Sequence, residues 1–196
     1  MNKSEAVQAL KGIIATHHIL HCFGIYLNTN DEAELQKALN ELLVECIRED
    51  RSLWSLFCLA GARPDWVDYD RRNMAHHFAS TNNVSCLQFV LEKGLDIHAR
   101  DKWEIAPAHL AAAGGQPGSL KFLLDNGFDI HAEDCKKRTI VHLAAWMGHL
   151  NCLKIAIEYG ANVDSLDYEG KTPYDLAVKR RSAAANKVAF WELLTK

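Results

Sequence analysis

The sequence lacks several features that mark large classes of proteins. Its 196 residues include only 4 prolines. They contain no run of 18 or more apolar residues that could form a membrane-spanning helix. The formal net charge is −3, from 22 lysines and arginines against 25 aspartates and glutamates. These absences exclude collagen-like chains, membrane-spanning helices and strongly basic nucleic-acid binders.

Cysteine pairing and targeting signals are also missing. The six cysteines show no CxxC motif and no regular spacing. The N-terminal residues have neither the basic start nor the small-residue cleavage site of a secretory signal. We therefore expect reduced thiols and a cytoplasmic protein, with signal-independent secretion as the alternative.

An internal repeat of 33 residues runs through much of the chain. Histidine, glycine and aspartate each recur in register at this interval. The recurring residues are His76, His109 and His142; Gly61, Gly94, Gly127 and Gly160; and Asp68, Asp101, Asp134 and Asp167. Repetition at this length is typical of solenoids, in which a unit buries its apolar face only by stacking on its neighbours.

Each unit has the pattern of two short helices. Polar turn residues precede an alanine-rich segment such as 106–113, and a second segment then carries leucines at helical spacing, as in 120–124. Gly94, Gly127 and Gly160 follow the second segments, where a helix can end on a left-handed residue. The pattern predicts an all-α solenoid.

These units resemble the ankyrin repeat, whose signature is roughly D-x-x-G-x-T-P-L-H-x-A-A, then a helix and G-A-D-x-N. The residues that carry the resemblance include Asp134, Thr139, His142, Ala144 and Ala145 in one unit, and Asp167, Gly170, Thr172 and Pro173 in the last. The likeness covers about residues 68–196. It implies an ankyrin-repeat α-solenoid with hairpin-like loops, and it implies that His76, His109 and His142 hydrogen-bond backbone across the loops.

The same register predicts how the whole chain is divided. Because the ends of a solenoid must be covered, we expect helices at 1–34 to cap its start. The remaining units are a degenerate repeat at 35–67, repeats at 68–100, 101–133 and 134–166, and a C-terminal capping repeat at 167–196.

The densest group of reactive side chains lies near the N-terminus. His17 and His21 are one helical turn apart and could share a metal ion, but no third ligand follows at a known spacing. Cys22 beside them could act as a nucleophile. We expect no catalytic residue, metal or cofactor, and keep an enzyme that uses Cys22 as an alternative.

Two further histidines occupy a position where the ankyrin signature has asparagine. His98 and His131 follow Asp-Ile in successive units. The resemblance implies that this position can be hydroxylated, and the alternative is an ordinary loop side chain that bonds nearby backbone.

The resemblance also implies where a partner binds, because ankyrin loop tips and the ends of the first helices face one surface. We expect Trp103, Ile105, Trp146 and Met147 to be exposed together. The expected basic rim consists of Arg72, Lys136, Arg138, Lys179 and Arg180. The predicted partner-binding residues are Tyr69, Arg72, Trp103, Ile105, Arg138, Trp146, Met147 and Tyr168.

The expected function is non-enzymatic binding of another protein by a monomer. A basic rim suits an acidic segment, and neither nucleic acid nor a membrane is expected as a partner. The alternative function is that of an effector which a bacterium delivers into a eukaryotic cell and which binds a host protein there.

Overall fold

The computed structural model describes residues 5, 8 and 67–179 of the chain. The chain divides into two compact units, Met1–Trp66 and Val67–Lys196. The predicted capping helices, the degenerate repeat, the cluster from His17 to Cys22 and the chain after residue 179 lie outside the described residues.

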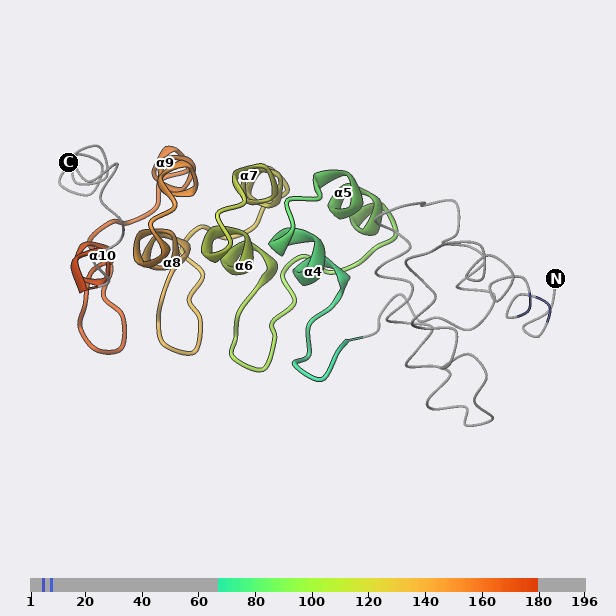
Figure 1. The fold of residues 1–196 in the computed structure, drawn as a ribbon, viewed down its shortest axis with the longest axis horizontal. Coiled ribbons are helices and arrows are strands. Elements are labelled where there is room, and N and C mark those ends of the chain that lie inside the picture. The colour runs from blue at the N-terminus through green and yellow to red at the C-terminus, as the bar shows by residue number, and fades with distance from the viewer. Residues whose placement is uncertain (1–4, 6–7, 9–66, 180–196) are drawn as a thin grey trace. The chain divides into compact units, whose positions relative to one another are not determined.

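Residues 67–179 form seven helices and no strand (Figure 1). Each of three repeats contributes a pair of helices, and a fourth repeat contributes its first helix. The helices are α4 (Met74–Ser80) and α5 (Val84–Glu92), α6 (Pro107–Ala113) and α7 (Pro117–Asp125), α8 (Ile140–Met147) and α9 (Leu150–Glu158), and α10 (Pro173–Lys179).

The helices of this unit form two layers. The first helices of successive repeats, α4, α6, α8 and α10, pack on one another in series, and α5, α7 and α9 form the second layer. The loops that precede the first helices all extend on one side of the stack (Figure 1). This arrangement confirms the predicted all-α solenoid.

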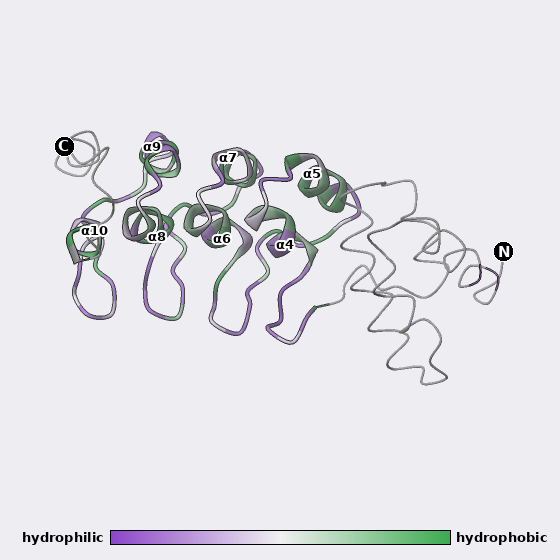
Figure 2. Ribbon diagram, viewed as in Figure 1, coloured by the Kyte–Doolittle hydropathy of each residue, from purple (hydrophilic) through white to green (hydrophobic). Residues whose placement is uncertain are grey.

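Small residues allow the first helices to pack closely. Ala108, Ala111 and Ala112 of α6 are fully buried, as are Ala144 and Ala145 of α8. Apolar residues lie mainly on the helices and polar residues mainly in the loops (Figure 2). Burial of the alanine faces between neighbouring repeats is therefore what holds the first layer together.

The second layer supplies the larger core side chains and the ends of the repeats. Leu87, Leu120 and Leu153 are fully buried at equivalent positions. The glycines that follow α5, α7 and α9 have φ angles of +82°, +87° and +83°. This confirms the predicted left-handed helix ends, which a residue with a Cβ would adopt only with strain.

Cys86, Ser119 and Cys152 share one position in the second layer, and all three are buried. The 33-residue interval places these three residues in register. Ser119 differs because its Oγ has no hydrogen-bond partner within residues 67–179. Burial raises the pKa of the Cys152 thiol to about 11, which keeps this thiol protonated and unreactive at neutral pH.

Candidate functional site

Each loop between repeats is a tight turn closed by its aspartate. Oδ1 of Asp101 accepts hydrogen bonds from the backbone N–H groups of Trp103, at 2.8 Å, and Ile105, at 3.0 Å. The N–H of Asp101 donates to the carbonyl of Ile105 at 2.9 Å. The same three bonds recur in the loops that begin at Asp68, Asp134 and Asp167.

Neighbouring loops are joined at their tips by one backbone hydrogen bond. The N–H of Lys102 donates to the carbonyl of Asp70 at 2.9 Å, and that of Cys135 donates to Trp103 at 3.0 Å. Tyr168 N–H donates to Lys136 at 3.0 Å. The tips therefore form a continuous row with a fixed backbone, and no strand is present in residues 67–179.

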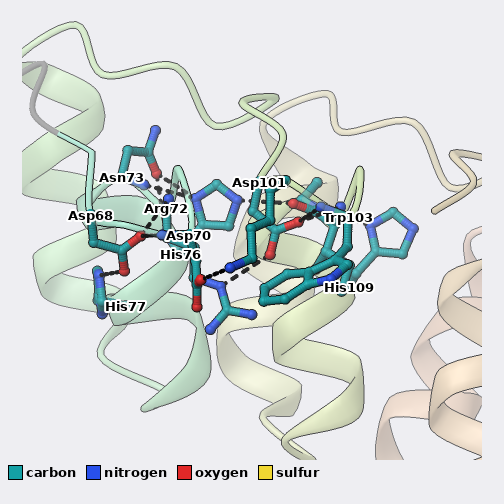
Figure 3. Close-up of polar contacts among 12 residues, drawn as sticks. Asp68, Asp70, Arg72, Asn73, His76, His77, Asp101, Trp103 and His109 are labelled. Atoms are coloured by element: carbon teal, nitrogen blue, oxygen red, sulfur yellow. Dashed lines mark hydrogen bonds and ion pairs between the residues drawn. The ribbon is translucent and has the colours of Figure 1, made fainter. Parts of the chain in front are cut away.

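The repeated histidines fix the start of each first helix. Nδ1 of His109 accepts from the N–H of Ala106 at 3.2 Å, and its Nε2–H donates to the carbonyl of Ala132 at 3.0 Å. His76 makes the same pair of contacts, to Asn73 and Ile105 (Figure 3). The predicted bonds across the loops are thus present.

Burial keeps these histidines neutral. Desolvation lowers the pKa of His109 to about 4, and it also lowers the pKa of His76 and of His142. A neutral ring can accept on Nδ1 and donate from Nε2, as the contacts require.

The other four histidines of residues 67–179 differ in their contacts. His77 lies 3.2 Å from Oδ2 of Asp68, and His149 Nε2–H donates to the carbonyl of Ala113 at 3.0 Å. The ring of His98 stacks on Phe128 with centroids 5.7 Å apart. His131 is exposed.

Residues 67–179 contain no group of three or more histidine, cysteine, aspartate or glutamate side chains placed to hold a metal ion. No helix described in the structure is long and apolar enough to span a membrane. Cys86 and Cys152 are buried, whereas Cys135 is exposed at a loop tip.

Comparison with known proteins agrees with the repeat register and the geometry of the loops. A family model described as ankyrin repeats (3 copies) matches residues 38–134 and again residues 108–190. The chain belongs to the ankyrin repeat family. No curated protein matches the sequence. Ankyrin repeats generally mediate protein–protein interaction and are typically non-enzymatic.

The predicted partner-binding residues of the ankyrin loops differ in exposure. Tyr69 is 93% exposed and Tyr168 61%, while Trp103 is 39% exposed and Trp146 37%. The expectation that Ile105 and Met147 share this exposure is wrong, because both are half-buried. Ile105 lies at the base of its loop rather than at the tip, and its backbone is bonded to Asp101.

A compact cluster surrounds Trp103 in the first two described loops. Arg72 donates from Nε to Oδ2 of Asp101 at 3.0 Å, and its guanidinium carbon lies 5.3 Å from the centroid of the Trp103 ring (Figure 3). The ammonium of Lys102 lies 4.3 Å from the same ring and 4.5 Å from the Tyr69 ring. We call Tyr69, Arg72, Lys102 and Trp103 the Trp103 patch.

Trp146 has a similar arginine. Arg138 donates from Nε and Nη2 to Oδ2 of Asp134 at 2.8 and 2.6 Å. Its guanidinium carbon lies 5.6 Å from the centroid of the Trp146 ring. Arg72 and Arg138 are thus already bound to carboxylates within the repeats, which the sequence prediction did not anticipate. Arg180 of the predicted rim lies outside the described residues.

Trp146 also borders an open depression of about 460 Å³. The depression brings together three of the predicted residues, but its lining does not include Trp103. We call it the Trp146 depression, and it is lined by Lys136, Arg138, Trp146, Asp167, Tyr168, Glu169, Lys171 and Leu176. The predicted surface is therefore two sites, the Trp103 patch and the Trp146 depression.

Six residues of these two sites are absent from the predicted partner-binding set, namely Lys102, Lys136, Asp167, Glu169, Lys171 and Leu176. Lys102 adjoins Trp103 at a loop tip, and its charge beside an aromatic residue is a signal that could have found it. Leu176 had no such signal because it belongs to a helix. Asp167 had none because an aspartate stands at this loop position in all four repeats, which marks it as part of the turn.

Proposed function

We propose that this ankyrin chain is a non-enzymatic module that binds another protein through its loop tips and the adjoining ends of its first helices. The observation that carries the proposal is the pair of partly exposed tryptophans, Trp103 and Trp146, each with a guanidinium over its ring. Tryptophan and arginine are the residue types most enriched among those that dominate binding energy at interfaces.

The rigidity of the tips supports this function. The turn aspartates and the backbone bonds between loops hold the tips in one conformation before a partner arrives. A preformed surface loses little conformational entropy on binding, so more of the contact energy appears as affinity.

The charge at the tips supports an acidic segment in the partner. Lys136 and Lys137 are exposed on the third described loop. Carboxylates of a partner would approach these ammonium groups, and such pairs contribute mainly to the rate of association and to orientation. We place the interaction in the cytoplasm, consistent with Cys135 and Cys152, neither of which forms a disulfide.

The proposal is tested by affinity purification from lysate of the native cell. Trp103→Ala, Trp146→Ala and the double variant are compared with the wild-type chain, and we expect each single variant to lose the partner that the wild type captures. Tyr159→Ala is the matched control, because it removes an aromatic side chain from the end of α9, in the other layer of helices.

Circular dichroism and thermal unfolding establish that each variant is folded. Equal capture of the partner by the wild type and by both folded tryptophan variants would contradict the proposal.

A further inference from the structure

The four loop aspartates do not have the same surroundings. Each uses Oδ1 for its own turn, which leaves Oδ2 for other contacts. Oδ2 of Asp68 lies 3.2 Å from His77, that of Asp101 bonds Arg72, and that of Asp134 bonds Arg138. Asp167 is different: no residue that the structure describes donates to its Oδ2.

Asp167 is only 7% exposed, and it lies in the wall of the Trp146 depression. Its Oδ2 is not one of the enclosed side-chain atoms that lack a partner, so a cationic group that enters the depression can approach it.

The repeat register explains why the donor is missing. Arg72 reaches forward from its own loop to Asp101 of the next one. The equivalent residue of the next loop is Ile105, which cannot donate to Asp134, and Arg138 bonds Asp134 of its own loop instead. Nε and Nη2 of Arg138 therefore donate to Asp134 and not to Asp167.

The remaining cations around the depression do not fill this position. Lys171, the residue equivalent to Arg138 in the last loop, forms an ion pair with Glu169. Lys136 lines the depression but makes no ion pair with Asp167. Of the four described loop aspartates, Asp101 and Asp134 each bond an arginine, Asp68 lies beside His77, and Oδ2 of Asp167 has neither among the described residues.

Two other loop aspartates of this chain show which chemical group binds at the position of Oδ2. At Asp101 and at Asp134, Oδ2 receives a guanidinium that also lies over an indole ring, that of Trp103 or of Trp146. The wall of the depression again places a loop carboxylate, Asp167, among aromatic rings, those of Trp146 and Tyr168.

We propose that the Trp146 depression binds an arginine side chain of the partner protein, whose guanidinium donates to Oδ2 of Asp167 and packs against Trp146 and Tyr168. This inference rests on the proposed protein-binding function and names the chemistry of one anchor. Arginine fits better than lysine, because its planar fork can bond a carboxylate and stack on a ring at the same time.

The first test is an NMR titration of the full chain with a blocked arginine peptide, acetyl-Gly-Arg-Gly-amide. We expect shifts at the Trp146 indole N–H and the Tyr168 amide. The same peptide with citrulline in place of arginine keeps the shape but lacks the charge, and we expect it to bind about tenfold more weakly or less.

Asp167→Asn tests the carboxylate itself. Its retained carbonyl oxygen can still accept from the N–H groups of Glu169 and Lys171, so the turn is preserved while Oδ2 becomes a donor. We expect about tenfold weaker binding of the arginine peptide. Asp164→Asn makes the same charge change at an exposed residue outside the depression and should leave binding unchanged.

Ile105→Arg tests the role of the register. An arginine there can reach Asp134 as Arg72 reaches Asp101, which releases Arg138 to bond Asp167 from within the chain. We expect this variant also to lose about tenfold in binding of the arginine peptide. Ile130→Arg adds the same charge outside the loop tips and should have no such effect.

The inference is overturned if the wild-type chain shows no shift with the arginine peptide, as would occur if an arginine of this chain already filled the site. It is also overturned if citrulline binds as well as arginine, or if Asp167→Asn binds as well as the wild type. Loss of the lysate partner from the tryptophan variants is a separate readout, so the proposed function can stand when this inference fails.

Discussion

The turns around the repeated histidines are nearly identical, whereas the loop tips beside them differ from repeat to repeat. The distance from Nδ1 to the backbone nitrogen is 3.2 Å at His76, His109 and His142, and each Nε2 lies 3.0 to 3.2 Å from a carbonyl oxygen. The tips instead carry tyrosine, tryptophan, lysine or cysteine.

The buried turns therefore determine the stability of the fold, whereas the side chains of the tips are available for binding. The buried turns satisfy backbone groups that would otherwise lack partners, so substitutions there affect the fold. The tips take their conformation from the aspartates and from backbone bonds, so their outward side chains can change without affecting it. Substitutions in the buried turns should therefore reduce stability more than substitutions at the loop tips.

His109→Ala is expected to have the largest effect. It leaves the N–H of Ala106 and the carbonyl of Ala132 without partners in a buried turn and also opens a cavity. We expect a loss of about 4 kcal/mol in the free energy of unfolding, measured by urea denaturation. His131→Ala, an exposed histidine of the same repeat, should cost less than about 0.5 kcal/mol. Similar losses of stability for the two variants would contradict the assigned role of His109 in the turn.

Gly115→Ala should break the contact between two repeats. Gly115 has a φ angle of +67°, and a Cβ there would lie 2.5 Å from Nδ1 of His149. We expect a loss of about 3 kcal/mol from the left-handed backbone and from displacement of the ring.

The matched control is Gly127→Ala. Gly127 has a φ angle of +87° but no atom within 4 Å of the added Cβ. This variant should lose only about 1 kcal/mol in thermal unfolding, and an equal loss for both glycines would contradict the assigned clash.

Mild acid should weaken the turns before it affects the tips. Because burial lowers the pKa of His109 to about 4 from 6.5, the unfolded chain binds more protons than the folded chain between these values. Stability is therefore complete above pH 6.5 and falls as the pH is lowered towards 4. Between pH 7.5 and 5.0 His109 alone should cost about 2 kcal/mol.

Urea denaturation at a series of pH values measures this loss. The lowered pKa values of His76 and His142 act in the same direction and add to the effect. Unchanged stability between pH 7.5 and 5.0 would contradict the assignment of neutral, buried rings.

Ser119→Cys is expected to stabilise the protein. It replaces a buried hydroxyl that has no partner in the described repeats with the residue found at the two equivalent positions. We expect a gain of about 1 kcal/mol in the free energy of unfolding. Ser119→Ala should gain less because it leaves a small cavity, and a loss with cysteine would show that the hydroxyl is satisfied.

Tyr69→Ala should have the smallest effect on stability. Its exposed ring contacts the ammonium of Lys102, an interaction worth about 0.5 kcal/mol at an exposed site. We expect a similarly small loss in thermal unfolding together with weaker capture of the partner. Tyr69→Phe keeps the ring and should retain most of both. A large loss of stability would show that this tip also supports the fold.

The regular part of the structure could be predicted from the sequence because local features determine it. The 33-residue period, the alanine-rich segments and the glycines indicate paired helices and their ends, and these are present in residues 67–179. The histidine contacts were predicted from the resemblance to ankyrin repeats. Each histidine hydrogen-bonds a backbone carbonyl that lies at the same place in every repeat.

The site could be predicted only in part. The tip positions identified Tyr69 and Tyr168 as exposed side chains, but counting positions could not show that Ile105 and Met147 are half-buried. Exposure depends on the angle at which each side chain leaves the loop or helix and on what the next repeat places over it.

The sequence by itself determined the repeat, its helices, its turns and the residue types at the tips, because these depend on contacts within one unit or between identical backbone groups. Only the tertiary structure decided which arginine bonds which aspartate. Arg138 bonds Asp134 four residues away, and no described residue donates to Oδ2 of Asp167. Arg72 instead bonds Asp101, which is 29 residues away and meets it only when the repeats stack.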